Sequence, residues 1–100
     1  MKAEGIAQKA TRLVSGNRKA AYGDVMDGLA RIAVLWNALL TAAGKAPARP
    51  LDEHDVGQMM VNLKQARSYT GPHRADNHVD QAGWSSVAGE AAERLSRRRR

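Results

Sequence analysis

The chain has 100 residues, of which 43% are hydrophobic, with 16 lysines and arginines against 10 aspartates and glutamates, and no cysteine. A chain of this length holds one hydrophobic core, so we expect a single domain. The missing cysteines exclude disulfide scaffolds, thiolate zinc sites and cysteine nucleophiles, and no run of about 18 apolar residues predicts a membrane-spanning helix.

The net charge of +6 is concentrated at the two ends of the chain. Residues 1–20 hold five bases and one acid, Arg97–Arg100 add four bases, and residues 21–96 hold seven bases and nine acids. We therefore expect a mildly acidic domain over residues 1–96 and a basic tail over residues 97–100 that contacts nucleic acid only weakly. The N-terminus lacks the apolar region of a signal peptide, so we expect a cytoplasmic protein.

The first predicted helix covers residues 3–14. Its apolar residues recur at helical spacing on one face: Ala3, Ile6, Ala7, Ala10, Leu13 and Val14. Ser15-Gly16 predicts its end.

The second predicted helix, over residues 24–43, is the most apolar. Asp24 is a candidate N-cap, and Gly44 follows the last periodic residue. Val34 and Leu35 lie off its main apolar stripe, so hydrophobic residues surround the helix almost completely. Such a helix is usually covered on more than one side, and we expect it to be the central helix or the seam between copies of the chain.

Two more helices are predicted after a proline-containing linker. The third covers residues 52–69, with Asp52 as N-cap and an apolar stripe of Val56, Met59, Met60 and Leu63 that Arg67 continues. The fourth covers residues 77–94 and begins at Asp76 or Asn77; its stripe is Trp84, Val87, Ala88, Ala91 and Leu95, with Asp80 on the same face.

These patterns predict an all-α fold. No segment alternates like a β-strand, and the four helices suit an antiparallel four-helix bundle. Eighteen alanines and no phenylalanine make a light core. We therefore expect a homo-oligomer, a dimer or tetramer, in which a second copy completes the buried surface.

The charged residues on apolar faces, Arg67 and Asp80, are the clearest candidates for a specific role. A charge removed from water needs a partner, so we predict an ion pair between them, with Asp76 as a second possible partner of Arg67. Asp76 and Asp80 are four residues apart on one helix face, and carboxylates in that arrangement can form half of a Mg²⁺ site. Capping by Asp76 and pairing of Asp80 explain the same residues without a metal.

Candidate ligands for a phosphate are mostly basic side chains. Lys64 lies one turn before Arg67, so both are expected to face an opening between the third and fourth helices. The full candidate set is Arg18, Tyr22, Lys64, Arg67, His73 and Arg74.

Four segments resemble a family of small, uncharacterised phage proteins that are similar to the all-α, MazG-like nucleotide pyrophosphohydrolases. They are Tyr22-Gly23, Ala33–Trp36, Asp55–Arg67 and Asp76–Trp84. The resemblance covers about residues 17–93, and its most specific parts are the Leu-Lys-x-Ala-Arg end of the third helix and the Asp-x-x-x-Asp-x-Ala-Gly-aromatic start of the fourth.

The resemblance implies a helical scaffold, an oligomer, nucleotide chemistry and, for a phage protein, the cytoplasm of an infected bacterial host. MazG-like enzymes hold Mg²⁺ with acidic residues on two helices and release pyrophosphate from nucleoside triphosphates. The second helix here offers only Asp24 and Asp27 at its start. Our hypothesis is therefore a non-catalytic phage accessory protein that binds a nucleotide-type ligand or a host protein, in host takeover or counter-defence. The alternatives are a divergent Mg²⁺-dependent pyrophosphohydrolase and a small DNA-binding protein.

Overall fold

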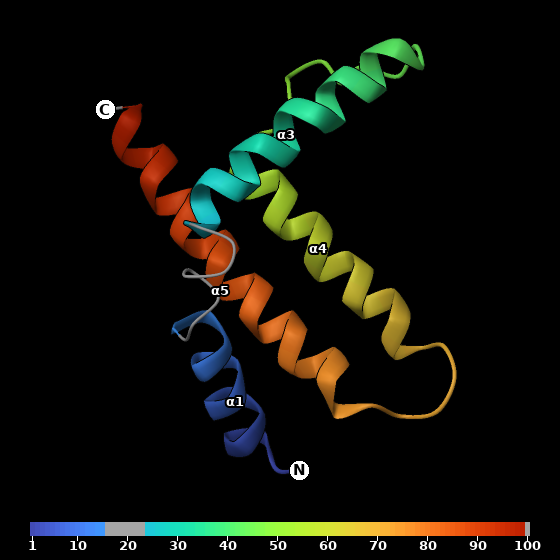
Figure 1. The fold of residues 1–100 in the computed structure, drawn as a ribbon, viewed down its shortest axis with the longest axis vertical. Helices are drawn as coiled ribbons and strands as arrows, with labels where there is room; N and C mark the ends of the chain where they lie inside the picture. The colour runs from blue at the N-terminus through green and yellow to red at the C-terminus, as the bar shows by residue number, and fades with distance from the viewer. Residues whose placement is uncertain (16–23, 100) are drawn as a thin grey trace.

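The computed structural model describes residues 1–15 and 24–99, and these form four α-helices with no β-strand among them (Figure 1). The helices are α1 (Ala3–Ser15), α3 (Val25–Ala42), α4 (Glu53–Ser68) and α5 (Ala75–Arg98). The prediction of an all-α fold is confirmed. The last helix begins before and ends after its predicted range of 77–94, so Arg97 and Arg98 of the predicted basic tail are helical.

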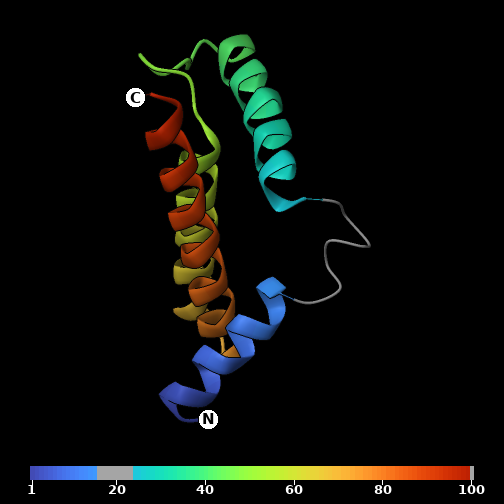
Figure 2. The same cartoon turned by 90° about the vertical axis from the view of Figure 1, so that its left-hand side faces the viewer.

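The helices α4 and α5 form an antiparallel hairpin, and α1 and α3 pack against it (Figures 1 and 2). Gly57 of α4 lies against Ala88 of α5, and further along Lys64 pairs with Asp80. The hairpin register therefore places Arg67 beyond Asp80, where the Asn77 side-chain amide donates to the Arg67 carbonyl at 3.5 Å.

The buried face of α4 differs from the predicted stripe. Met59 and Leu63 are exposed, whereas Val56 and Gly57 are buried. The face is rotated toward Gly57 because a residue without Cβ lets α5 approach closely there. Hydrophobic spacing alone does not mark a glycine as the contact point.

The core joins the first half of α3 to the hairpin. Met26, Leu29 and Ala33 of α3 cluster with Val56 and Ala91, and partly buried hydrophobic residues surround this cluster. The second half of α3 extends beyond the hairpin in Figure 1. There, the Asn37 side-chain amide accepts a hydrogen bond from the Leu51 N–H at 2.9 Å and donates one to the Leu51 carbonyl at 3.0 Å. These bonds hold the connection between α3 and α4 against α3.

The helix α1 packs on the first half of α5. Its one buried residue is Ala10, and its last turn lies over Gly83, where an added Cβ would stand 3.6 Å from Val14 and 3.8 Å from Leu13. Figure 2 shows α1 crossing that end of the hairpin. The packing brings the end of α1 toward α3 and α4.

Aspartates cap two of the helices, as predicted. Asp24 accepts from the Met26 N–H at 2.8 Å, and Asp52 accepts from the Asp55 N–H at 2.9 Å. The expected cap of α5 is not Asp76 or Asn77: Arg74 holds the N-cap position without a side-chain cap bond. Asp76 instead lies in the first turn, where a carboxylate complements the helix dipole.

The molecule is open for its length, and α3 is its most apolar helix. The radius of gyration is 14.9 Å, above the roughly 13 Å typical of a 100-residue domain. By length and composition alone α3 could cross a membrane, with a mean hydropathy of 1.3 over 18 residues. One such helix is weak support for a membrane protein, because core helices pass the same test and α3 contributes three residues to the core.

Candidate functional site

A groove of about 680 Å³ lies between α1, α3, α4 and α5 and is here called the central groove. Its lining is largely apolar and includes Leu13, Val14, Val25, Leu29, Ile32, Met60, Leu63, Trp84 and Val87. Six charged residues complete it: Asp24, Lys64, Arg67, Asp80, Glu90 and Arg94. Apolar walls with a few charged groups are typical of small-molecule sites.

An ion pair between α4 and α5 is the best-enclosed polar contact of the central groove. Lys64 Nζ lies 3.0 Å from Asp80 Oδ2, and the two side chains are 17% and 28% exposed. The prediction that Arg67 is the partner of Asp80 is therefore wrong. The hairpin register brings Lys64 opposite Asp80 and carries Arg67 past it.

Arg67 lines the central groove while remaining exposed. No carboxylate of the described residues lies within ion-pair distance of its guanidinium. The prediction that Lys64 and Arg67 face one opening between α4 and α5 agrees with this lining. A guanidinium with open donors is suited to a phosphate or carboxylate of a ligand.

The two carboxylates predicted as metal ligands have different partners. Asp80 pairs with Lys64 of α4, whereas Asp76 is exposed, pairs with Lys9 of α1 at 3.4 Å and does not line the central groove. The hairpin directs the two side chains to different neighbours, although they are one turn apart. The predicted Mg²⁺ pair is thus not gathered at one site.

The remaining predicted phosphate ligands are divided between two places. Arg18 and Tyr22 lie outside the described residues. His73 and Arg74 are exposed on the connection between α4 and α5, and neither lines the central groove. The ring of His73 is 6.1 Å from that of His78.

Two charged residues of the central groove, Glu90 and Arg94, were not among the predicted site residues. They form an ion pair at 2.7 Å along α5. Their i, i+4 spacing was a readable signal. Glu90 also begins a Glu-x-x-Glu pattern with Glu93, which pairs with Arg97 at 3.7 Å.

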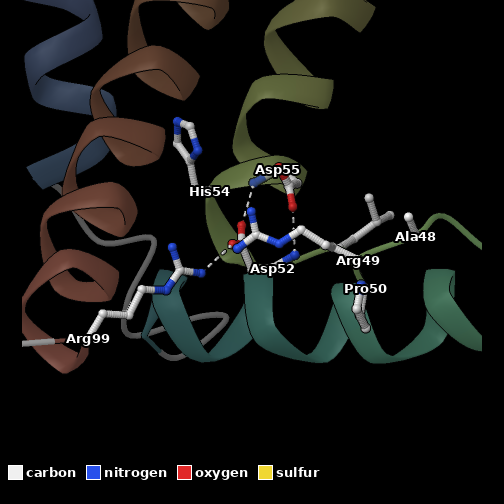
Figure 3. Close-up of a pocket in the computed structure, with 8 residues that line it drawn as sticks. Ala48, Arg49, Pro50, Asp52, His54, Asp55 and Arg99 are labelled. Atoms are coloured by element: carbon white, nitrogen blue, oxygen red, sulfur yellow. Dashed lines mark hydrogen bonds and ion pairs between the residues drawn. The ribbon is translucent and has the colours of Figure 1, made fainter.

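A second pocket, of about 610 Å³, lies where the end of α5 meets the start of α4 (Figure 3). Arg99 pairs with Asp52 at 3.4 Å, and Arg98 pairs with Glu53 at 3.5 Å. Arg98 and Arg99 of the predicted basic tail are therefore paired with carboxylates of their own chain. A helix N-terminus attracts negative charge, and the acidic first turn of α4 in turn attracts these arginines.

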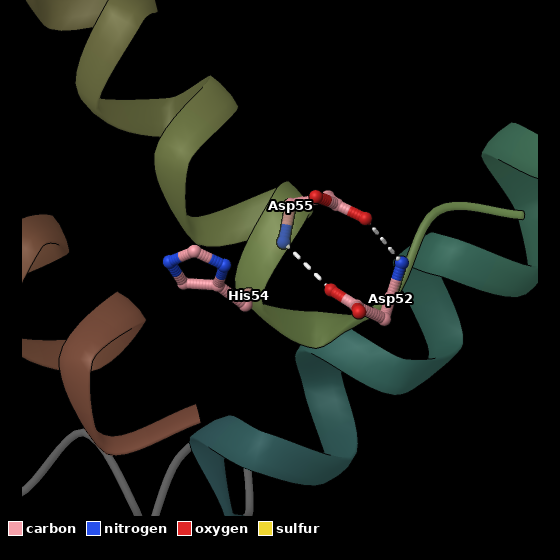
Figure 4. Close-up of side chains that lie close together, drawn as sticks. All are labelled: Asp52, His54 and Asp55. Atoms are coloured by element: carbon pink, nitrogen blue, oxygen red, sulfur yellow. Dashed lines mark hydrogen bonds between the residues drawn. The ribbon is translucent and has the colours of Figure 1, made fainter. Parts of the chain in front are cut away.

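Asp52, His54 and Asp55 are the described residues whose donor atoms come close enough together to hold a metal ion, all within 4.8 Å (Figure 4). Both carboxylates already act in a capping box: Asp52 accepts from the Asp55 N–H, and Asp55 accepts from the Asp52 N–H, each at 2.9 Å. The Asp-x-x-Asp spacing was the signal for this reciprocal cap. The cluster is accounted for as the N-terminus of α4.

The environment of Asp52 favours its charged form. Partial burial alone would raise the pKa of Asp52, but hydrogen bonds with the backbone and side chain of Asp55, together with the charges of Arg99 and His54, hold its pKa below the usual value. The charged form is therefore more stable in the folded chain than in the unfolded chain.

A pH-dependent loss of stability should follow from Asp52. Its contribution is complete above the unfolded-chain pKa of about 4 and is lost as pH falls through the lower, folded pKa. Asp52→Asn keeps a cap acceptor but removes this titration, so its stability should fall less steeply with acid than that of the unchanged protein. Urea unfolding at a series of acidic pH values measures the slope, and equal slopes would contradict the assignment.

Comparison with known proteins identifies phage relatives. A family model described as "Domain of unknown function (DUF6378)" matches residues 5–92. The Gene 55 protein of Mycobacterium phage L5 is 34% identical over 82 residues, 82% of this chain and 49% of that protein. The Gene 55 protein of Mycobacterium phage D29 is 32% identical over 83 residues, 82% of this chain and 50% of that protein. The chain spans about half the length of these curated relatives, and no solved structure matches it.

Proposed function

The chain belongs to the DUF6378 family of phage proteins, and from that premise we propose that it is an accessory protein that binds a nucleotide-type ligand in the central groove. The observation that carries the proposal is the placement of Trp84, Lys64 and Arg67 along one groove. An indole offers a stacking surface for a base, and cationic side chains suit phosphates. In a phage, such binding would serve host takeover or counter-defence.

Binding without hydrolysis is supported by the partners of the acidic side chains that line the groove. Asp80 pairs with Lys64, Glu90 pairs with Arg94, and Asp24 caps α3. Two-metal phosphate chemistry needs carboxylates that converge on the ions. These three are not among the described groups that gather within 4.8 Å.

A divergent Mg²⁺-dependent pyrophosphohydrolase is the second candidate. Asp24, Asp80 and Glu90 reach the central groove from α3 and α5, and Glu90 starts the Glu-x-x-Glu pattern typical of one metal-binding helix in MazG-like enzymes. Binding of phosphate and metal would have to displace Lys64 and Arg94 from these carboxylates. A DNA-binding role has less support, because Arg97, Arg98 and Arg99 pair within the chain.

Titration calorimetry with nucleoside mono- and triphosphates tests the proposal. We expect saturable binding that is the same with Mg²⁺ and with EDTA, and no release of pyrophosphate. Arg67→Ala should weaken triphosphate binding about tenfold, because it removes a charge-assisted hydrogen-bond donor. Arg67→Lys, which keeps the charge, should recover part of that loss.

The matched control is Arg31→Ala, which removes an exposed arginine of α3 that does not line the central groove. It should leave nucleotide affinity unchanged. Pyrophosphate release that depends on Mg²⁺ would favour the enzyme instead. If no nucleotide binds, the proposal is overturned, and the balanced charges of the groove would favour a host protein as its occupant.

A further inference from the structure

The helix α3 carries a second apolar face in addition to the one in the core. Its residues alternate at intervals of three and four: Val25, Gly28, Ile32, Leu35, Leu39 and Ala42. This is the a/d spacing of helices that pack along a seam. We call this set the α3 seam; the buried core residues Met26, Leu29 and Ala33 are not part of it, whereas Val25 and Ile32 of the seam also pack, partly buried, against that core.

The second half of the α3 seam is uncovered. Leu35 is 63% exposed and Leu39 66% exposed. In the first half of the seam, the space at Gly28 is also open, because a Cβ added there would meet nothing within 4 Å. Val25, Gly28 and Ile32, in the first half, line the central groove. The seam therefore continues from the groove wall onto an open helix surface.

The amount of exposed surface is sufficient for a partner. The chain exposes 7233 Å², whereas a compact monomer of its mass is expected to expose about 5,500 Å². The surplus of about 1,700 Å² is roughly twice the 800 Å² that each partner contributes to a standard interface.

We propose that the α3 seam packs against the α3 seam of a second copy, antiparallel and centred on Leu35. When two α3 helices are opposed in this register, Gly28 lies opposite the partner's Ala42, and Ile32 lies next to the partner's Leu39. Small residues meet at both ends and large ones meet in the middle. The contact between the two seams itself uses no ligand of the central groove.

The charges beside the seam select the antiparallel orientation. Asp24 immediately precedes α3, and Lys45 follows it after the C-cap Ala43 and Gly44. Antiparallel packing places Asp24 opposite the partner's Lys45, whereas parallel packing would place like charges together. The helix dipoles are also opposed only in the antiparallel pair.

The pairing completes one wall of the central groove. Gly28 and Ile32 belong to both the seam and the groove lining, so the partner's Leu39 and Ala42 come to lie beside that wall. The groove of one copy is then bordered by the α3 helix of the other.

Sedimentation equilibrium tests the interface. The unchanged protein should have about twice the 10.8 kDa chain mass. Leu35→Glu and Leu39→Glu should each raise the dimer dissociation constant about a hundredfold, since a carboxylate would be buried in the seam. Val34→Glu is the matched control, because Val34 is 68% exposed but lies outside the seam; it should leave the dimer intact.

Circular dichroism should show that the glutamate variants keep their helices, so that a monomeric mass reports the interface and not unfolding. A monomer at every concentration, or equal disruption by Val34→Glu, overturns the proposal. So does flotation of the monomeric protein with phospholipid vesicles, which would assign the α3 seam to a membrane surface.

Engineered cysteines test the orientation in a chain that contains none. Leu35→Cys should cross-link to itself across the two-fold axis. Gly28→Cys should cross-link only when mixed with Ala42→Cys, because these positions meet between copies. Self-cross-linking of Gly28→Cys without that of the mixed pair would indicate parallel helices and contradict the model.

Discussion

Replacing Gly57 with leucine should destabilise the protein by about 3 kcal/mol, near the upper end of typical overpacking effects. A Cβ at this position would lie 2.8 Å from the Ala88 Cβ and 3.0 Å from the Ala88 Cα. The second atom belongs to the backbone, so α4 and α5 would have to separate. Urea unfolding followed by far-UV circular dichroism measures the change in the free energy of unfolding.

Gly89→Ala is the matched control for Gly57→Leu. Gly89 is in the same hairpin, on α5, but an added Cβ there meets nothing within 4 Å. Alanine should therefore stabilise the helix by about 0.5–1 kcal/mol through its higher helix propensity. If Gly57→Leu were tolerated as well as Gly89→Ala, the close contact between α4 and α5 would be refuted.

Leu29→Ala should also cost about 3 kcal/mol, within the range of leucine truncations in protein cores. Leu29 is fully buried and joins α3 to Val56 of α4 and Ala91 of α5. Its truncation leaves a cavity at the point where α3 is anchored to the hairpin. The loss is a substantial share of the roughly 5–15 kcal/mol expected for a domain of this size.

Val34→Ala provides the comparison on the same helix. Val34 is exposed and lies outside both the core cluster and the α3 seam, so its truncation should change stability by no more than about 0.5 kcal/mol. Thermal unfolding of both variants, at a concentration where they have the same oligomeric state, distinguishes them. Equal effects would place Leu29 outside the core and contradict the packing of α3.

The helices and two of their caps were predictable because their signals are local. Asp24 and Asp52 precede apolar periodic segments and bond N–H groups two or three residues later. The end of α5 was not predictable from such signals. Arg98 and Arg99 are held by Glu53 and Asp52, 45 and 47 residues away, and propensity contains no information about such partners.

The candidate site was predictable only as a set of residues, without its pairings. Lys64, Arg67 and Asp80 were selected as charges on or near apolar faces, and all three line the central groove. Which cation reaches Asp80 depends on the hairpin register, and a shift of one turn exchanges Arg67 for Lys64. That Glu90 lines the central groove follows only from the packing of α3 against α5.

The sequence by itself determined that this chain is helical, where its helices lie and that α3 is apolar on more than one side. These properties depend on residues within a turn or two of each other. Only the tertiary structure decided the register of the hairpin, the partner of Asp80, the docking of the arginine run and the exposure of the α3 seam. The excess of positive charge near the C-terminus is therefore partly balanced within the fold, because three arginines there pair with carboxylates of the same chain. The physical reason is that such contacts depend on distances between segments far apart in the chain, as where the missing Cβ of Gly57 lets α4 lie close against Ala88 of α5.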